Sequence, residues 1–250
     1  MHHPKLIEPF FPPDHPLRAI VDAVLEGGVG SISLDDPIQP RAVRLSVGCY
    51  EIFGGDPDRA LGLARDFSAP CELIYGNDPG WRGFLLSVYG SRLADRPMEI
   101  FQLSLDVPRL QAAVNALAPP YRMQALTADW LDQLDAELQP HGLQTYAGKN
   151  AFLAHGFGFG AVLDGILACA ATTYTCSATR AEIAIATRPA HQRKGLAFAV
   201  AARILLQCVE RGITPAWSAA NPVSKRLALR LGFRPAGICE VLYLHPGPIG

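Results

Sequence analysis

The stretch QRKGLA, residues 192–197, decides how the second half of this 250-residue chain folds. The run AEIAIAT before it, residues 181–187, alternates small or polar residues with branched ones, as a half-buried strand does. After it, apolar residues recur at helical spacings from Leu196 to Arg211. The segment therefore predicts a strand that turns through a basic, glycine-containing loop directly into a helix. The free backbone N–H groups at such a helix N-terminus favour an anion, best a phosphate or pyrophosphate.

The composition is typical of a globular enzyme, with 49% hydrophobic and 18% charged residues. The net charge of -1 argues against broad attraction to nucleic acid or to an anionic membrane, so phosphate binding must be local. No apolar run approaches the roughly 20 residues that span a bilayer, and the start MHHPK does not resemble a signal peptide. We expect a cytoplasmic protein, monomer or homodimer, with neither a nucleic-acid nor a membrane partner.

The six cysteines are scattered without CxxC or histidine-rich metal spacing. This distribution predicts reduced, mostly buried thiols and no metal site.

Pro119-Pro120 is the clearest break near the middle of the chain, because Pro-Pro cannot continue a helix. It predicts an N-terminal α/β domain over residues 1–118 and a catalytic domain over residues 119–250. In the second domain the patterns predict elements in this order: a strand at 121–126, a helix capped by Thr127, a loop at 156–160, a hairpin turning at Asp164-Gly165, the strand, loop and helix described above, a strand at 215–218, a helix from Asn221 to Leu231, and closing strands at 233–244.

The first half has a similar order of elements. Its patterns predict strands at 44–53, 71–75 and 98–105, and helices at about 58–67 and 78–89. Its GNDP segment at 76–79 parallels AANP at 219–222. An internal repeat and a chance likeness both explain this order. The first copy lacks the basic hexapeptide, so it would be a scaffold or a substrate-side module.

The second half resembles the GNAT N-acetyltransferases, whose signature [QR]-x-x-G-x-[GA] is matched by residues 192–197. The segment NPVSKRLALRLGF at 221–233 is similar to the second helix of that family and its terminal Gly-Phe. The resemblance covers about residues 120 to 244. Further positions, among them Thr187 and Trp217, resemble a two-domain bacterial branch that includes zwittermicin A resistance-like acetyltransferases. The resemblance to the GNAT family implies an α/β (α+β mixed-sheet) GNAT fold in the C-terminal half. It leaves open whether the smaller N-terminal domain is a degenerate half-GNAT repeat.

The resemblance also implies acetyl-CoA as the acyl donor. The backbone N–H groups of the loop would hold its pyrophosphate, with Gly195 allowing an approach that a Cβ would block. The basic side chains of the loop would add charge, or would form a solvated face. Asn221 would contact the cofactor arm or serve as a plain helix cap. The full predicted binding set comprises Ile185, Ala186, Thr187, Gln192, Arg193, Lys194, Gly195, Leu196, Ala197, Asn221 and Ser224, with backbone groups of the first three facing the pantetheine amides.

The chemistry needs a group that removes a proton from the attacking amine. Glu182 is the first candidate, and its alternative role is that of an exposed residue at a strand end without catalytic function. His191 is the second candidate, and its alternative role is that of a solvated loop residue. The tyrosine with which many family members protonate the leaving thiolate is replaced by Ala228, so Ser218, Ser224, Tyr243 or solvent would supply that proton. Ser218 also stands where the closer branch has Asp, which leaves acceptor recognition open.

The sequence thus predicts transfer of acetyl to a primary amine of a small molecule, by direct attack in a ternary complex. Cys176 has no His/Asp arrangement that would make it a covalent acyl carrier. The acceptor side is expected near Tyr174, with the glycines of loop 156–160 forming a mobile substrate gate. The alternatives are a non-catalytic CoA-binding or ligand-sensing module, and a structural or partner-binding protein that kept only the fold.

Overall fold

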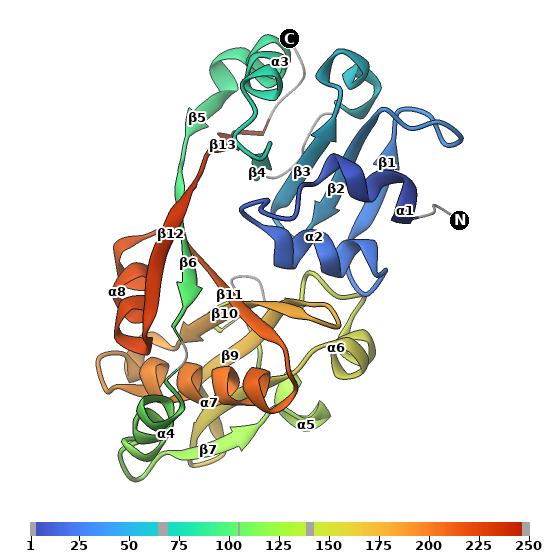
Figure 1. Cartoon of the computed structure of the whole chain (residues 1–250). Coiled ribbons are helices and arrows are strands. Elements are labelled where there is room, and N and C mark those ends of the chain that lie inside the picture. Colours follow the sequence, from blue (N-terminus) through green and yellow to red (C-terminus); the bar gives the residue numbers. More distant parts are fainter. Residues whose placement is uncertain (1–3, 65–69, 105, 139–142, 247–250) are drawn as a thin grey trace.

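Two mixed β-sheets form the frame of the molecule, one in the upper and one in the lower part of Figure 1. The computed structural model describes residues 4–64, 70–104, 106–138 and 143–246. The first sheet contains, in spatial order, β1 (Ser31–Leu34), β2 (Ala42–Val47), β3 (Tyr50–Gly55), β4 (Cys71–Ile74), β13 (Val241–Leu244) and β5 (Leu93–Asp95). The second contains β12 (Phe233–Cys239), β6 (Met98–Leu103), β11 (Thr214–Ala219), β10 (Arg180–Thr187), β9 (Ile166–Cys176), β8 (Gly158–Leu163) and β7 (Arg122–Ala125).

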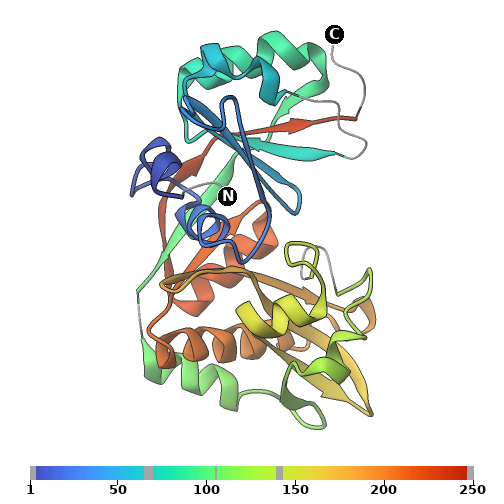
Figure 2. The ribbon, with the colours of Figure 1, turned by 90° about the vertical axis from the view of Figure 1, so that its right-hand side faces the viewer.

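Helices separate and cover the two sheets, and Figure 2 shows these layers from the side. The helices are α1 (Pro4–Ile7), α2 (Arg18–Leu25), α3 (Pro79–Tyr89), α4 (Val107–Asn115), α5 (Ala128–Leu131), α6 (Lys149–His155), α7 (Leu196–Glu210) and α8 (Pro222–Leu231). Short 3-10 turns cover Glu8–Phe10, Pro57–Arg59, Leu61–Leu63, Gly90–Arg92 and Pro189–His191. None of the described helices is both long and apolar enough to cross a membrane.

Three apolar clusters hold these layers together. One lies between the sheets and joins residues of both halves, such as Ile20 of α2, Ile52 of β3 and Leu167 of β9. A second packs α7 and α4 against the second sheet, and a third packs α3 against the first sheet. Because the central cluster draws on both halves, the two sheets share a continuous core.

Local signals in the sequence formed the expected turns and caps. Asp164 and Gly165 have φ values of 49° and 77°, as the turn between β8 and β9 requires. The side chains of Asp78 and Asn221 cap α3 and α8, each with proline at the first helical position. Thr127 precedes the four-residue α5 as predicted, but its side chain makes no capping bond.

The two sheets repeat one pairing pattern. In the first, β1, β2 and β3 are antiparallel, β3 and β4 are parallel, and β4, β13 and β5 are antiparallel. In the second, β8, β9 and β10 are antiparallel, β10 and β11 are parallel, and β11, β6 and β12 are antiparallel. This agreement supports the predicted mixed-sheet fold with a half-GNAT repeat.

Each half gives its last strand to the sheet of the other half. Strand β6 comes from the first half and lies between β11 and β12, whereas β13 comes from the second half and lies between β4 and β5. Figure 1 shows the green and red strands running side by side from one sheet to the other. The exchange crosses the predicted boundary between residues 118 and 119, and the division at that position stays a prediction.

Three predicted elements differ from the structure. The single strand expected at 44–53 is instead two antiparallel strands, β2 and β3, with Gly48 and Cys49 in the turn between them. The helix expected at about 58–67 is replaced by the 3-10 turns that end at Leu63, and residues 65–69 lie outside the described part. The mobile gate expected at 156–160 is wrong, because Gly158 and Gly160 belong to β8. An added Cβ would lie 2.7 Å from the Ala171 carbonyl oxygen at Gly158 and 2.9 Å from that of Cys169 at Gly160. These glycines serve close strand packing.

His15 makes the stability of the fold depend on pH. The Leu17 N–H donates to His15 Nδ1, and within the described residues the buried Nε2 has no partner. Burial, with a smaller effect of the charge on Arg18, lowers the pKa of His15 from 6.5 to about 4. Between these values the unfolded chain binds a proton that the folded chain does not, so stability falls as the pH falls through this range.

We predict that His15→Asn, which keeps an acceptor for Leu17 but cannot titrate, loses this dependence. Between pH 7.5 and pH 5 the free energy of unfolding of the native protein should fall by about 2 kcal/mol more than that of the variant. Urea unfolding at the two pH values measures the difference. The exposed His155 provides the control, since His155→Asn should follow the native protein. Equal slopes for His15→Asn and the native protein would contradict the prediction.

Candidate active site

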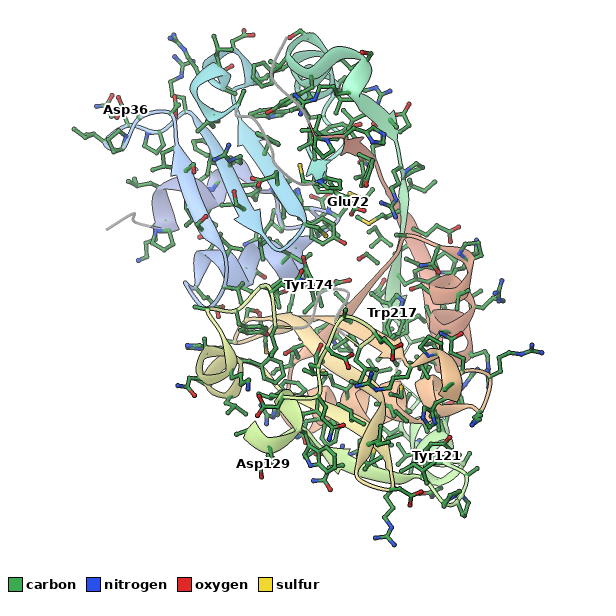
Figure 3. The ribbon with its side chains drawn as sticks, turned by 180° about the vertical axis from the view of Figure 1, so that it is seen from behind. Asp36, Glu72, Tyr121, Asp129, Tyr174 and Trp217 are labelled. Carbon is green, nitrogen blue, oxygen red and sulfur yellow. The ribbon has the colours of Figure 1, made fainter. Side chains whose placement is uncertain are left out.

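A cleft of about 1080 Å³ opens between the two sheets. Its walls come from β10 and the loop after it, from β11 and α8, from β9, and from the first half of the chain. Figure 3 shows Glu72, Tyr174 and Trp217 in succession from the first sheet to the second. The lining includes most of the residues predicted for the site: Glu182, Ile185, Ala186, Thr187, His191, Gln192, Arg193, Gly195, Leu196, Ala197, Ser218, Asn221 and Ser224.

The cleft exists because β10 and β11 part. They pair only from Arg180 to Glu182, opposite Thr214 to Ala216. Beyond that point β11 continues along β6, while β10 continues to Thr187 along β9 alone. On the side that β11 has left, the backbone of residues 183–187 therefore faces the cleft. Unpaired backbone N–H and C=O groups need partners, which an extended ligand with amides can supply.

The QRKGLA loop follows at the end of β10 and has the geometry of an anion site. Arg193 and Gly195 both have left-handed backbone, with φ of 63° and 79°. Gly195 starts α7 without any side-chain cap, and no hydrogen bond from the N–H groups of residues 193–197 to another described residue is found. Such successive free N–H groups form a concave anion site, which the helix dipole strengthens.

The structural reason for Gly195 differs from the one expected. A Cβ at this position would meet no protein atom within 4 Å. The left-handed φ is what favours glycine here, and the open space beside it is available to a ligand.

The side chains of the loop make different contacts. Gln192 Nε2 donates to the Thr187 carbonyl at 3.2 Å and so fastens the loop to the end of β10. Lys194 donates to the hydroxyl of Tyr121, which also contacts His191 Nδ1 at 2.8 Å. Lys194 is not among the described residues that line the cleft, whereas Arg193 is. Arg226 and Arg230 of α8 add basic charge to the same rim, and sequence reasoning missed both.

Glu182 lies where β10 and β11 part. The residue is only 5% exposed, so the alternative of an exposed residue at a strand end is wrong. Both the backbone N–H and the hydroxyl of Ser218 donate to its Oε1, at 2.8 and 2.7 Å. Burial raises the pKa of Glu182 to about 7, and the two bonds from Ser218 oppose that rise. A carboxyl group that titrates near neutral pH is suited to proton transfer.

Comparison with known proteins agrees with this geometry. A family model described as GNAT acetyltransferase matches residues 14–241. The chain belongs to the GNAT acetyltransferase family. The match begins far upstream of residue 120, where the sequence motifs alone placed the start of the resemblance.

Individual relatives show how far the likeness reaches. The uncharacterized N-acetyltransferase YdfB of Bacillus subtilis (strain 168) is 35% identical over 85 residues, 33% of this chain and 33% of that protein, so the match spans about a third of the relative's length. A GCN5-related N-acetyltransferase-like protein from Streptococcus suis 89/1591 has a TM-score of 0.83 at 23% identity, covering 97% of this chain and 98% of that one. A tandem GNAT protein from the clavulanic acid biosynthesis pathway has a TM-score of 0.55 at 15% identity, covering 84% of this chain and 80% of that one. These structures show the GNAT fold across both halves.

The remaining predicted residues have structural contacts that limit their roles. Ser224 Oγ accepts from the Trp217 indole at 2.9 Å, and Asn221 Oδ1 accepts from two N–H groups of α8. His191 follows the end of β10, and Thr187 at that end is about 16 Å along the strand from Glu182. The candidate base Glu182 and the candidate His191 therefore lie toward opposite ends of the GNAT cleft.

Of the side chains expected to protonate the leaving thiolate, Ser218 and Ser224 line the cleft, and their role stays a prediction. Ala228 is fully buried in the core beside α7 and has no proton to give. Tyr243 belongs to β13 of the other sheet, where its ring packs under Arg96 at 5.0 Å. Burial raises the pKa of Cys176 to about 11, which keeps it a thiol and agrees with the absence of a covalent role.

Sequence reasoning left open a substrate-side role for the first half of the chain but named none of its residues. Cys49, Tyr50, Glu72 and Arg96 line the cleft opposite Glu182. The available signal was Glu72 itself, a carboxylate inside the otherwise apolar strand CELI. A charged residue in a buried strand indicates a specific partner or a site.

The contacts of Glu182 predict the effect of Ser218→Ala. Removing the hydroxyl removes a bond that favours the carboxylate, so the pKa of Glu182 should rise, with a titration midpoint about one pH unit higher. Carbon-13 NMR of the glutamate carboxyl groups, assigned with Glu182→Gln, measures the midpoint. Ser218→Thr keeps a hydroxyl and should restore a value near 7. A midpoint in Ser218→Ala at or below the native value would refute this account.

Proposed function

We propose that this protein is an acetyl-CoA-dependent N-acetyltransferase that acetylates a primary amine of a small molecule by direct attack in a ternary complex. The observation that carries the proposal is a single cleft with an unpaired strand edge that links a buried carboxyl group to an anion-binding loop. Family membership supplies the reaction class, and the cleft supplies a place for donor and acceptor together.

The donor would lie along β10. The free N–H groups of residues 193–197 suit its pyrophosphate, and the unpaired backbone of Ile185, Ala186 and Thr187 suits the amides of its pantetheine arm. Arg226 and Arg230 place further positive charge beside this path. Asn221 and Ser224 would contribute by holding the start of α8 and Trp217, since their oxygens already accept protein hydrogen bonds.

Proton transfer is assigned to Glu182. With a pKa of about 7 it is partly ionised at neutral pH and accepts a proton from the incoming ammonium. The neutral nitrogen then forms a bond to the acetyl carbon and the carbon–sulfur bond breaks. The nitrogen then gives its second proton to solvent, and the departing thiolate takes a proton from solvent, so that the charges balance. No dedicated acid is required, in keeping with Ala228.

The loop geometry predicts a selective loss of donor binding in Gly195→Leu. Acetyl-CoA should raise the thermal midpoint of the native protein, because a ligand bound to the native state stabilises it. In the variant, side chain and backbone strain would disturb the free N–H groups, and the affinity for acetyl-CoA should fall at least tenfold. Calorimetric titration with acetyl-CoA measures it.

Gly212 offers a matched control at the other end of α7. It also has a left-handed φ, of 69°, and a Cβ there would also meet no atom within 4 Å. Gly212→Leu should therefore cost similar stability while acetyl-CoA affinity is kept. If Gly195→Leu binds acetyl-CoA as tightly as Gly212→Leu does, the loop does not hold the donor. If acetyl-CoA causes no thermal shift in the native protein, donor binding is refuted altogether.

The role of Glu182 predicts that Glu182→Gln lowers turnover at least tenfold at neutral pH while acetyl-CoA binding survives. Turnover of the native protein should rise with pH through about 7, as the carboxyl group ionises, and this rise should vanish in the variant. Release of free thiol with a panel of primary amines measures both. Unchanged turnover would remove Glu182 from the mechanism.

Ala228 favours one alternative, a GNAT-like module that binds CoA without catalysis. Donor binding without thiol release from any amine would support that alternative and contradict the proposed reaction.

A further inference from the structure

The side of the cleft that the first half provides has a chemistry of its own. Tyr50 on β3 and Glu72 on β4 are register partners, and both line the cleft. Arg96 joins them from the turn between β5 and β6, where the chain passes from one sheet to the other. Figure 3 shows Glu72 on the first-sheet side and Tyr174 on the second-sheet side of this space.

Glu72 is a buried carboxylate with a spare acceptor. The residue is 7% exposed, and within the described chain its one recorded partner is Arg96, with Nη1 3.2 Å from Oε1. The second oxygen has no recorded donor among the described residues. Burial raises the pKa of Glu72 and the charge of Arg96 opposes this rise. Neither oxygen of Glu72 is among the fully buried atoms of the described residues that lack a partner, so the open oxygen is reachable from the cleft that Glu72 lines. It can therefore accept a hydrogen bond from a donor on a ligand bound there.

Two tyrosines form the wall between Glu72 and Glu182. The rings of Tyr50 and Tyr174 meet edge to face with centroids 5.6 Å apart. The Tyr174 hydroxyl donates to the Val47 carbonyl, and that of Tyr50 points to Met98 Sδ. With the hydroxyls so engaged, a ligand in the cleft would meet ring surface, mainly that of the half-buried Tyr50, since Tyr174 is only 3% exposed. Aromatic faces suit a methylene chain and attract a nearby cation.

The charges around this end of the cleft favour a cationic acceptor. The charged side chains that line it are Glu72, Glu182 and Arg96, and Arg96 is already paired with Glu72. An acceptor carboxylate drawn to Arg96 would stand beside Glu72 and be repelled. A second nitrogen on the acceptor meets the opposite situation, because it would supply donors and positive charge to the open oxygen.

We propose that the acceptor is a primary amine that carries a second cationic nitrogen, with the reacting nitrogen toward Glu182 and the second nitrogen bound by the Glu72 carboxylate. The inference rests on the proposed function and adds the substrate class to it. The bonds formed and broken are those given above, and the second nitrogen keeps its protons throughout. Glu72 then determines specificity and takes no part in the chemical step.

The test compares kcat/KM for a series of linear α,ω-diamines with the matching monoamines and the matching ω-amino acids, measured by thiol release from acetyl-CoA with the full-length protein. At the best chain length the native protein should prefer the diamine to the monoamine at least tenfold. In Glu72→Gln the diamine should lose at least tenfold and the monoamine should stay within about twofold, because it never used the carboxylate. A merely structural role of Glu72 would lower both equally.

Two control variants isolate the carboxylate. Asp95→Asn removes a negative charge from the same sheet where it pairs with Arg82 outside the cleft, and should leave the diamine preference unchanged. Arg96→Lys keeps a cation beside Glu72 and should leave that preference unchanged.

The possible results separate the two proposals. Equal rates for diamines and monoamines, or a preference for ω-amino acids, would overturn the inference while leaving the acetyltransferase intact. Acetyl-CoA binding without thiol release from any amine would overturn the proposed function, and this inference with it. If Glu72→Gln does not fold, the native preference across the three series decides the question by itself.

Discussion

The site depends on the separation of two parallel strands. β10 and β11 stay paired for three residues and then part, so that a strand in the middle of a sheet acquires a free edge. The separation opens this edge to the cleft. The carboxyl group at the start of the edge and the loop beyond its end then face the same cleft. A regular sheet of the same sequence would have satisfied the backbone of residues 183–187 internally and left no path for a ligand with amides of its own.

The two carboxyl groups of the cleft are stabilised in different ways. Glu182 receives two neutral donors from Ser218 and no cation, which leaves its proton affinity high. Burial raises the pKa of Glu72 as well, but its guanidinium partner Arg96 opposes that rise and favours the ionised form. Two acids with such different surroundings are suited to different tasks, one to move a proton and the other to hold a charge.

Features that a short segment determines could be predicted from the sequence. The turn at Asp164-Gly165, the caps at Asp78 and Asn221, and the loop before α7 depend on residues within a few positions of one another. The helix expected near residues 58–67 was wrong because apolar spacing alone cannot show that the chain turns tightly from Pro57 to Leu63. Glycines at 158 and 160 suggested mobility, while the neighbouring strand shows that they allow close packing.

The acceptor side could not be predicted for a different reason. Glu72 and Glu182 are far apart in sequence, and they face the same space only because the sheets of the two halves stack across a shared core. No periodicity within either half records that stacking. The hydrogen bonds of the Glu182 carboxyl group likewise come from Ser218, which belongs to a strand beyond the whole of α7.

The exchange of strands has a mechanical consequence. The connections β5–β6 and β12–β13 cross from one sheet to the other as neighbours, and at the crossing the Arg96 N–H donates to the Val241 carbonyl. Two domains joined by a single linker can rotate freely relative to each other. Here any rotation of one sheet against the other would twist a hydrogen-bonded pair of strands and disrupt the packing of the shared core. The width of the cleft mouth is thus set by the backbone, and substrates must enter and leave through adjustments of side chains and of the segments at its rim.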